Sequence, residues 1–227
     1  MTLMIRIAAA LLAAPLAPAA AQQSIEAPGT VAHAAAATGF PERVGEFRRT
    51  SVTRFDEAGR NIAAGYALAR GDRRLVLTIY IYPAARLASA PGSGQAADIA
   101  RAQLCRAEFD GVQQVISRQY RDVSLIENGP APAIAGVEPQ LSHKSVHRLE
   151  ARFGADVQQV RSETYLYCFV GGDWLVKYRA TSHLDLDATS AVETFIRSGP
   201  WPGRQVQDAP MVAETAPAAN PLSLASR

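Results

Sequence analysis

Cysteine and lysine are scarce in this chain of 227 residues. The two cysteines are Cys105 and Cys168, and lysine occurs only at Lys144 and Lys177. The cysteines lack the Cys-x-x-Cys spacing that a catalytic dithiol prefers. The formal net charge is only +2 and the basic residues are scattered, so the chain lacks the clustered positive charge of a nucleic-acid-binding surface. These shortages argue against a thiol oxidoreductase and against a nucleic-acid-binding protein.

Long apolar stretches are also missing, since no segment after the N-terminal region approaches the ~20 apolar residues that span a bilayer. The N-terminal region has Arg6, an apolar run from Ile7 to Leu16, and then the small residues Ala19–Ala21. This layout predicts a signal peptide over residues 1–21. Prolines within the run argue against the alternative, a buried alanine-rich helix. No cysteine directly follows the predicted cleavage site after Ala21, so we expect a periplasmic or secreted protein without a membrane anchor.

The common catalytic fingerprints are absent too. The sequence has no phosphate loop and no dinucleotide-binding fingerprint. Ser93, within Gly92-Ser93-Gly94, lacks the Gly-x-Ser-x-Gly elbow of a hydrolase. Asp185 and Asp187 are better explained as residues that begin a helix than as a catalytic pair. The sequence therefore predicts a protein that is not an enzyme and that needs no cofactor.

What the sequence does contain is organised as one domain between two simple ends. Residues 22–38 are rich in alanine with little periodicity, which is typical of a flexible linker. Residues 203–227 carry several prolines and no apolar face, so we expect a disordered Ala/Pro-rich tail. The segment between them, residues 39–202, is long enough for a single domain with its own core.

Alternation of side chains predicts an antiparallel sheet of six or seven strands. In Arg74–Tyr82, Leu75 and Ile79 share one face while Tyr80 and Tyr82 share the other. Turn-prone pairs such as Gly71-Asp72 join neighbouring strands, which excludes a purely parallel sheet. The other predicted strands are Arg48–Phe55, Ile62–Arg70, Val123–Glu127, Gln140–Phe153, Val157–Val170 and Trp174–Thr181.

Two helices complete the predicted α+β fold. A long central helix is expected from about Gln95 to Tyr120, with Cys105 on its buried stripe. A C-terminal helix follows, capped by Asp185 or Asp187 and stopped by Gly199-Pro200.

The two cysteines are the strongest candidates for a defined chemical role. Cys105 points inward from the long helix, and Cys168 shares a strand face with Leu166 and Val170. In an exported protein, two inward-facing cysteines predict a disulfide. The alternative is two separate buried thiols that act as small hydrophobic side chains.

The strand that carries Cys168 also predicts an aromatic surface. Alternation places Tyr165, Tyr167 and Phe169 on the face opposite Cys168. If that face is open, it is a possible binding face. In the alternative, the last helix covers it through Val192, Phe195 and Ile196, whose spacing forms an apolar stripe.

Two histidines, His143 and His147, raise the question of a metal site. Four residues apart on a helix, they would converge on one ion, but on a strand this spacing separates them by about 13 Å. We interpret the segment as a strand and the two side chains as exposed, so no metal site is predicted.

Three segments resemble parts of uncharacterised exported proteins of Gram-negative bacteria. They are the entry from Phe40 to Arg49, the strand end Thr78–Tyr82, and Trp174–Arg179 before the final helix. The order of elements is similar to the α/β/α layout of the PsbP protein of photosystem II and of DcrB-type envelope lipoproteins. The resemblance implies an accessory or binding protein and supplies no catalytic residue. The lipidation cysteine of the DcrB-type proteins is missing here.

Together these observations predict an exported, non-enzymatic accessory or binding module of the cell envelope. Its partner would be an envelope protein or a small molecule. The alternative is a small-molecule-binding protein or a weakly marked hydrolase that uses the aromatic sheet face or the loop Asn128–Pro139.

Overall fold

A computed structural model describes residues 22–85 and 94–204. The predicted signal peptide, Ser93 and all but the start of the predicted tail lie outside these residues. Among the residues described, no helix is long and apolar enough to cross a membrane.

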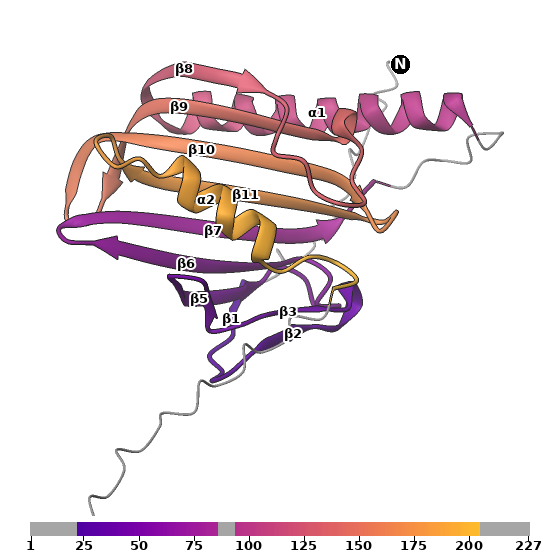
Figure 1. The fold of residues 1–227 in the computed structure, drawn as a ribbon, viewed down its shortest axis with the longest axis horizontal. Helices are drawn as coiled ribbons and strands as arrows, with labels where there is room; N and C mark the ends of the chain where they lie inside the picture. The colour runs from indigo at the N-terminus through magenta and orange to yellow at the C-terminus, as the bar shows by residue number, and fades with distance from the viewer. Residues whose placement is uncertain (1–21, 86–93, 205–227) are drawn as a thin grey trace, which may run out of the picture.

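A nine-stranded antiparallel sheet forms the body of the protein (Figure 1). Its strand order is β1-β5-β6-β7-β11-β10-β9-β8, and β4 pairs with β5 beside this path. The long strands pair with their neighbours in sequence within β5–β6–β7 and within β8–β9–β10–β11, and the pairing of β7 with β11 joins these two groups into one open sheet. The strands are β1 (Gln23–Ser24), β4 (Arg43–Val44), β5 (Phe47–Arg54), β6 (Ile62–Arg70), β7 (Arg73–Pro83), β8 (Arg121–Gly129), β9 (Ser142–Phe153), β10 (Asp156–Val170) and β11 (Trp174–His183).

Two helices lie on opposite sides of this sheet (Figure 1). The long helix α1 (Gln95–Gln119) packs over β8, β9 and β10. The shorter helix α2 (Thr189–Ser198) lies on the other side. The predicted α+β class, with a long helix packed on an antiparallel sheet and a C-terminal helix, is confirmed.

The side of the sheet that faces α2 carries the main core. Its centre is aromatic, with the rings of Tyr66 and Phe195 4.9 Å apart and those of Tyr167 and Trp201 5.0 Å apart. Buried tyrosine hydroxyls donate hydrogen bonds here, as from Tyr66 to the main-chain carbonyl of Pro41 at 3.0 Å and from Tyr165 to the Glu163 carboxylate at 2.5 Å. Hydrogen bonding therefore removes most of the cost of burying these polar groups.

Residues 22–38, predicted to be a flexible linker, belong to the fold. They contain β1, β2 (Val31–His33), the short helix η1 (Ala34–Ala36) and the start of β3 (Thr38–Phe40). His33 is fully buried, and its ring lies 5.2 Å from that of Trp174. The linker prediction overlooked main-chain pairing, which orders a segment even where its side chains are small.

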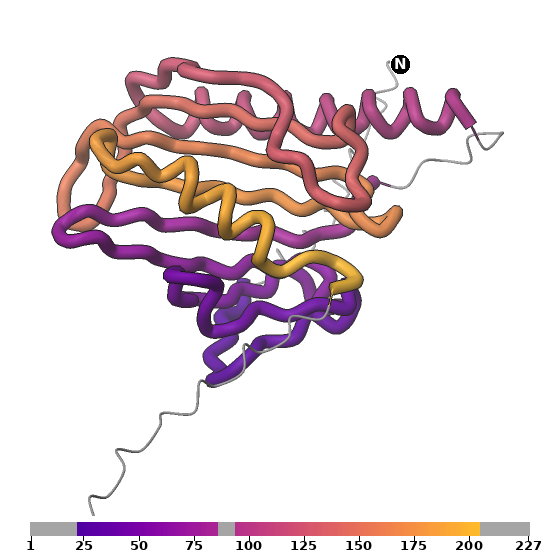
Figure 2. The backbone as a smooth tube through the Cα atoms, viewed as in Figure 1, coloured from indigo at the N-terminus to yellow at the C-terminus, as the bar shows by residue number. Residues whose placement is uncertain are grey.

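The chain returns to this N-terminal region after α2 (Figure 2). The main-chain N–H of Gly203 donates to the carbonyl of Ala36 at 2.9 Å. The predicted cap of α2 differs from the structure, because Ala188 occupies the N-cap position and makes no side-chain cap hydrogen bond. Asp185 instead pairs with Arg73 at 2.5 Å.

Candidate functional site

The disulfide joins the long helix to the middle of the sheet. Cys105 on α1 and Cys168 on β10 are bonded, with their Cα atoms 5.7 Å apart. Both cysteines are almost fully buried, among Phe109, Leu166 and Leu175. The predicted bridge is therefore confirmed, and it fixes the N-terminal half of α1 over the sheet.

A bulge in β10 separates Phe169 from the two tyrosines with which it was predicted to share a face. The register between β10 and β11 shifts between Tyr167 and Val170, and Phe169 has a left-handed φ of 55°. Phe169 consequently packs beside the disulfide, whereas Val170 joins the core on the α2 side. Simple alternation misplaces both residues, because a bulge adds one residue to the strand.

Tyr165 and Tyr167 remain on the α2 side, where both are fully buried. Phe195 and Ile196 of α2 belong to the same apolar cluster as the two tyrosines. The Tyr167 hydroxyl donates to the carbonyl of Pro132 at 3.1 Å. The predicted aromatic binding face is thus covered by α2, as the alternative interpretation of this face expected.

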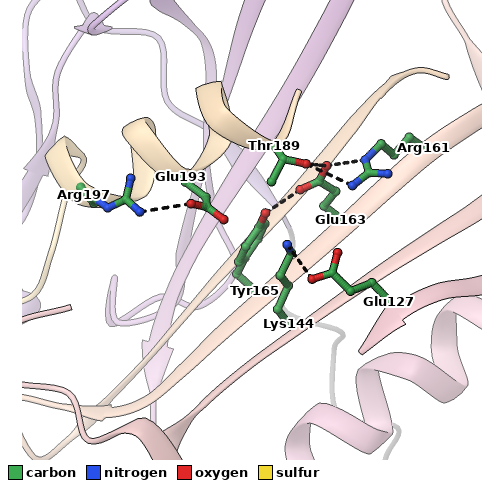
Figure 3. A network of polar contacts seen from close by, with 8 residues as sticks. All are labelled: Glu127, Lys144, Arg161, Glu163, Tyr165, Thr189, Glu193 and Arg197. Atoms are coloured by element: carbon green, nitrogen blue, oxygen red, sulfur yellow. Dashed lines mark hydrogen bonds and ion pairs between the residues drawn. The ribbon is translucent and has the colours of Figure 1, made fainter. Parts of the chain in front are cut away.

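Glu163 is a buried carboxylate at the centre of a polar network below the start of α2 (Figure 3). It accepts hydrogen bonds from Tyr165 Oη at 2.5 Å, Arg161 Nε at 2.6 Å and Thr189 Oγ1 at 3.0 Å. Burial and the Glu163 charge raise the pKa of Tyr165, so its hydroxyl remains a donor. All these partners belong to β10 or α2, and the network therefore fastens the helix to the sheet.

The two lysines of the chain have different surroundings. Lys144 on β9 is buried and pairs with Glu127 of β8 at 2.9 Å (Figure 3). Lys177 on β11 is half-buried and forms no ion pair with residues 22–85 or 94–204. Its Nζ atom instead lies 4.6 Å from the ring centre of Tyr80 and 5.7 Å from that of Tyr82. The ammonium of Lys177 is therefore contacted by aromatic rings, whereas that of Lys144 pairs with a carboxylate.

Arg179 is a second cation on the same face, two residues further along β11. Its Cζ atom lies 4.8 Å from the ring centre of Tyr120, the residue that ends α1. Within the part of the chain that the structure describes, Arg179 forms no ion pair. Its cross-strand partners are Thr164 on β10 and Thr78 on β7. Two threonines therefore flank Arg179 in the sheet.

α1 covers only part of β7 and β11 on its side of the sheet. A groove therefore runs between the helix and these two strands. Its central hollow measures about 380 Å³, with Tyr80, Lys177 and Arg179 on the sheet wall and Glu108 and Val115 on the helix wall. We call this hollow the α1 groove. It adjoins a hollow of about 440 Å³ at the C-terminal end of α1 and one of about 450 Å³ beside the disulfide. Small-molecule sites typically occupy ~300–1,000 Å³.

The electrostatics of the α1 groove are positive. Burial lowers the pKa of Lys177, while the carboxylate of Glu108 opposes this shift. Glu108 accepts a 2.8 Å hydrogen bond from the Tyr82 hydroxyl, and burial followed by the Glu108 charge raises the pKa of Tyr82. Two cations, Lys177 and Arg179, thus face one carboxylate in the hollow, which leaves one positive charge in excess.

Buried polar atoms gather on the same side of the sheet. Thr164 Oγ1, Ser145 Oγ, Ser162 Oγ and His147 Nδ1 have no hydrogen-bond partner among the described residues. They are neighbours in register, since Ser145 pairs with Thr164 and His147 with Ser162 across β9 and β10. Buried polar groups in native proteins are nearly always hydrogen-bonded. Such a concentration is typical of a site that holds water or a polar ligand.

His143 and His147 lie on the α1 side of the sheet and neither is exposed, so the prediction of exposed strand histidines is wrong. The His143 ring lies 5.1 Å from that of Phe109, and His147 is almost fully buried. Burial lowers the pKa of both imidazoles, and nearby arginines add to the effect. No group of three or more metal-ligating side chains occurs in residues 22–85 and 94–204.

The loop Asn128–Pro139, considered as a hydrolase element, lies against the core on the α2 side. Ala131 and Ile134 within it are buried in the same cluster as the α2 residues. This part of the loop therefore lies on the other face of the sheet from the α1 groove. The end of the loop reaches the α1 side, where Val137 packs beside the disulfide and the short helix η2 (Pro139–Leu141) contacts α1.

The sequence interpretation did not bring Tyr80, Lys177 and Arg179 together. Alternation placed Tyr80 and Tyr82 on one face of their strand, but it did not determine which face of the sheet this was. The missing information is the pairing of β7 with β11, which sets Lys177 directly opposite Tyr80. The one sequence feature that pointed to this site was Lys177, a lysine in a strand with many apolar residues.

Comparison with known proteins identifies no relative of this chain. No family model matches the chain, and neither a curated protein nor a solved structure gives a significant match.

Proposed function

We propose that this protein is an exported, non-enzymatic binding module that holds a small molecule in the α1 groove. The observation that carries the proposal is the half-buried ammonium of Lys177, which lies in the groove without an ion-pair partner among the described residues. Removing a charge from water costs free energy unless a partner compensates for it. Charged groups in such positions are enriched at functional sites.

The shape of the region supports the same assignment. The α1 groove and its two neighbours form a line of hollows beside α1. The α1 groove shares Tyr80 and Arg179 with the hollow at the C-terminal end of the helix. A further hollow of similar volume, about 430 Å³, lies next to α2. The cation there, Arg70, already pairs with Glu46 at 2.8 Å. The excess charge there is the carboxylate of Asp187, so the α2 hollow lacks the uncompensated cation that distinguishes the α1 groove.

Export is supported by the N-terminal sequence pattern and by the disulfide, since such bonds persist mainly in oxidising compartments. The layered arrangement, with helices on both sides of an antiparallel sheet, is compatible with a PsbP/DcrB-like fold. Relatives of that fold are mostly accessory or binding proteins, which agrees with a binding role. Fold-level likeness remains an associational argument, so the proposal depends on the groove.

A steric block tests the proposal. Gly111 lies in the wall of the α1 groove, and a Cβ atom at this position meets open space. Gly111→Trp should fill the hollow, whereas Gly111→Ala should leave it open. In a thermal-shift panel of anionic, neutral and cationic small molecules, at least one compound should raise the Tm of the wild type and of Gly111→Ala. The same compound should leave Gly111→Trp unchanged. If no compound acts, or if Gly111→Trp responds like the wild type, the groove is not the binding site.

A further inference from the structure

The excess charge of the α1 groove defines the ligand class, if the proposed function holds. We infer that the groove takes an amphipathic monocarboxylate, with its carboxylate at Lys177 and Arg179 and its apolar body against α1. Two cations and one carboxylate line the hollow, so a single negative charge would bring it to neutrality. A ligand with two charges would leave one uncompensated in a partly desolvated site.

Thr164 provides a donor for the same carboxylate. Its side chain is fully buried, lines the hollow, and has no hydrogen-bond partner for Oγ1 among the described residues. It lies directly opposite Arg179 in the β10–β11 pair. A carboxylate has two oxygen atoms and can accept from a guanidinium and a hydroxyl together. The buried hydroxyl would thereby gain the partner that burial demands.

The ammonium of Lys177 is placed to act on this anion by charge. The rings of Tyr80 and Tyr82 contact it from the sheet. Glu108 provides a longer-range opposing charge and accepts a hydrogen bond from Tyr82. The protein thus offsets part of the lysine charge without forming an ion pair, and the remainder is available to a ligand. Desolvation strengthens such a charge interaction relative to water.

Apart from Glu108, the helix wall of the groove is apolar, and this surface would contact the body of the ligand. Val112, Val115 and Ile116 line it, and Val115 is 56% exposed. Gly111 beside them leaves open space. An apolar ligand body would cover Val115 and contribute about 25 cal/mol for each Å² of apolar surface removed from water.

Isothermal titration with three probes of equal chain length tests this inference. The probes are octanoate, its neutral analogue octanamide, and octyl phosphate, which approaches two negative charges. Octanoate should bind at least tenfold more tightly than either of the others. Arg179→Gln and Lys177→Met should each weaken octanoate binding at least tenfold, because hydrogen bonds to charged groups typically contribute ~1.5–3 kcal/mol. Arg70→Gln, a charge removed on the α2 side, should have no effect.

Arg179→Lys separates charge from folding effects, because it keeps the positive charge and should retain part of the octanoate affinity. If octanamide binds as well as octanoate and Gly111→Trp blocks both, the ligand class is wrong and the groove assignment stands. Preferred binding of octyl phosphate would likewise overturn the choice of a monocarboxylate. Failure of all three probes to bind would overturn the inference, while the wider compound panel still decides the proposed function. Octanoate binding that survives Gly111→Trp would contradict both.

Discussion

Lys177 and Tyr80 are direct cross-strand partners in β11 and β7, and the lysine Nζ atom lies 4.6 Å from the centre of the tyrosine ring. The ring holds the ammonium at the wall of the α1 groove rather than in bulk water. A cation–π contact contributes only ~0.5–2 kcal/mol, which is similar to the cost of partly burying the charge. The pair therefore adds little to stability, and its importance should be in binding.

Lys177→Met tests this balance. Methionine keeps a long side chain against Tyr80 and removes the partly buried charge. We expect the free energy of unfolding to change by no more than about 1 kcal/mol. The loss of the cation–π contact and the removal of the desolvation penalty of the charge should offset each other. Urea denaturation measures the difference. A loss above ~2 kcal/mol would instead give Lys177 a structural role.

The disulfide should contribute strongly to stability. Cys105 and Cys168 are 63 positions apart. On the chain-entropy model, closing a loop of this size raises the free energy of the unfolded chain by ~4 kcal/mol, and disulfides typically stabilise proteins by ~2–4 kcal/mol. Replacing both cysteines by alanine should lower the free energy of unfolding by that amount in urea. Dithiothreitol should destabilise the wild type similarly and leave the double variant unchanged. Equal stability with and without the bond would contradict this expectation.

The network around Glu163 should anchor α2 to the sheet. Glu163→Gln leaves the Arg161 guanidinium without its carboxylate, and we expect a loss of ~3 kcal/mol in the free energy of unfolding. Thr189→Val removes one neutral donor and should cost ~1 kcal/mol. Glu193→Gln is the matched control, because its ion pair with Arg197 is exposed and spaced i,i+4. It should cost less than ~0.5 kcal/mol, and similar losses in all three variants would refute the anchoring role.

Acidification should destabilise the protein through three histidines that are wholly or partly buried. Burial lowers the pKa of His33, His143 and His147 from the ordinary value of 6.5. The unfolded chain therefore binds more protons than the folded chain between the lowered values and 6.5. Stability from this source is complete above about pH 6.5 and declines as the pH falls through that window.

The measurement is the free energy of unfolding in urea between pH 7.5 and 5.5. His147→Leu should reduce the slope of stability against pH, since Leu cannot take up the proton. The measured slope in the variant would equal that of the wild type if His147 were freely protonated in the folded protein.

Two glycines should respond in opposite ways to alanine. Gly111 lies within α1 and faces open space, so Gly111→Ala should stabilise the protein by ~0.5–1 kcal/mol through helix propensity. At Gly65 in β6, an added Cβ would lie 2.6 Å from Ser51 Oγ and 3.0 Å from Thr50 Oγ1. Gly65→Ala should therefore destabilise by ~1–3 kcal/mol. Thermal melts of both variants would show shifts of the same sign if this steric interpretation were wrong.

Most of the fold could be predicted from local sequence patterns. The strand Ile62–Arg70 matches β6, and the long helix expected from Gln95 begins at that residue. The disulfide followed from the facing of Cys105 and Cys168 together with the expected compartment. These features depend on periodicity within one element, which a single sequence displays.

The candidate site was harder to predict because it depends on pairing between distant segments. Tyr80 and Lys177 meet only because β7 pairs with β11, although α1 and three strands separate them in the sequence. Phe169 was misplaced by a bulge that no local pattern announced. His33 was missed because its neighbours are alanines, although main-chain hydrogen bonds order the segment.

The partial covering of the sheet by α1 has a consequence for how the protein can change. Along β7, Leu75, Leu77, Ile79 and Ile81 are buried on the α2 side, while Tyr80 and Tyr82 belong to the groove side. The residues that stabilise the domain and those that line the hollows beside α1 therefore alternate along one strand. Substitutions at every second position can therefore change the wall of the groove while the core beneath stays the same, and if the proposed binding holds, this strand is where specificity could be changed with least effect on stability.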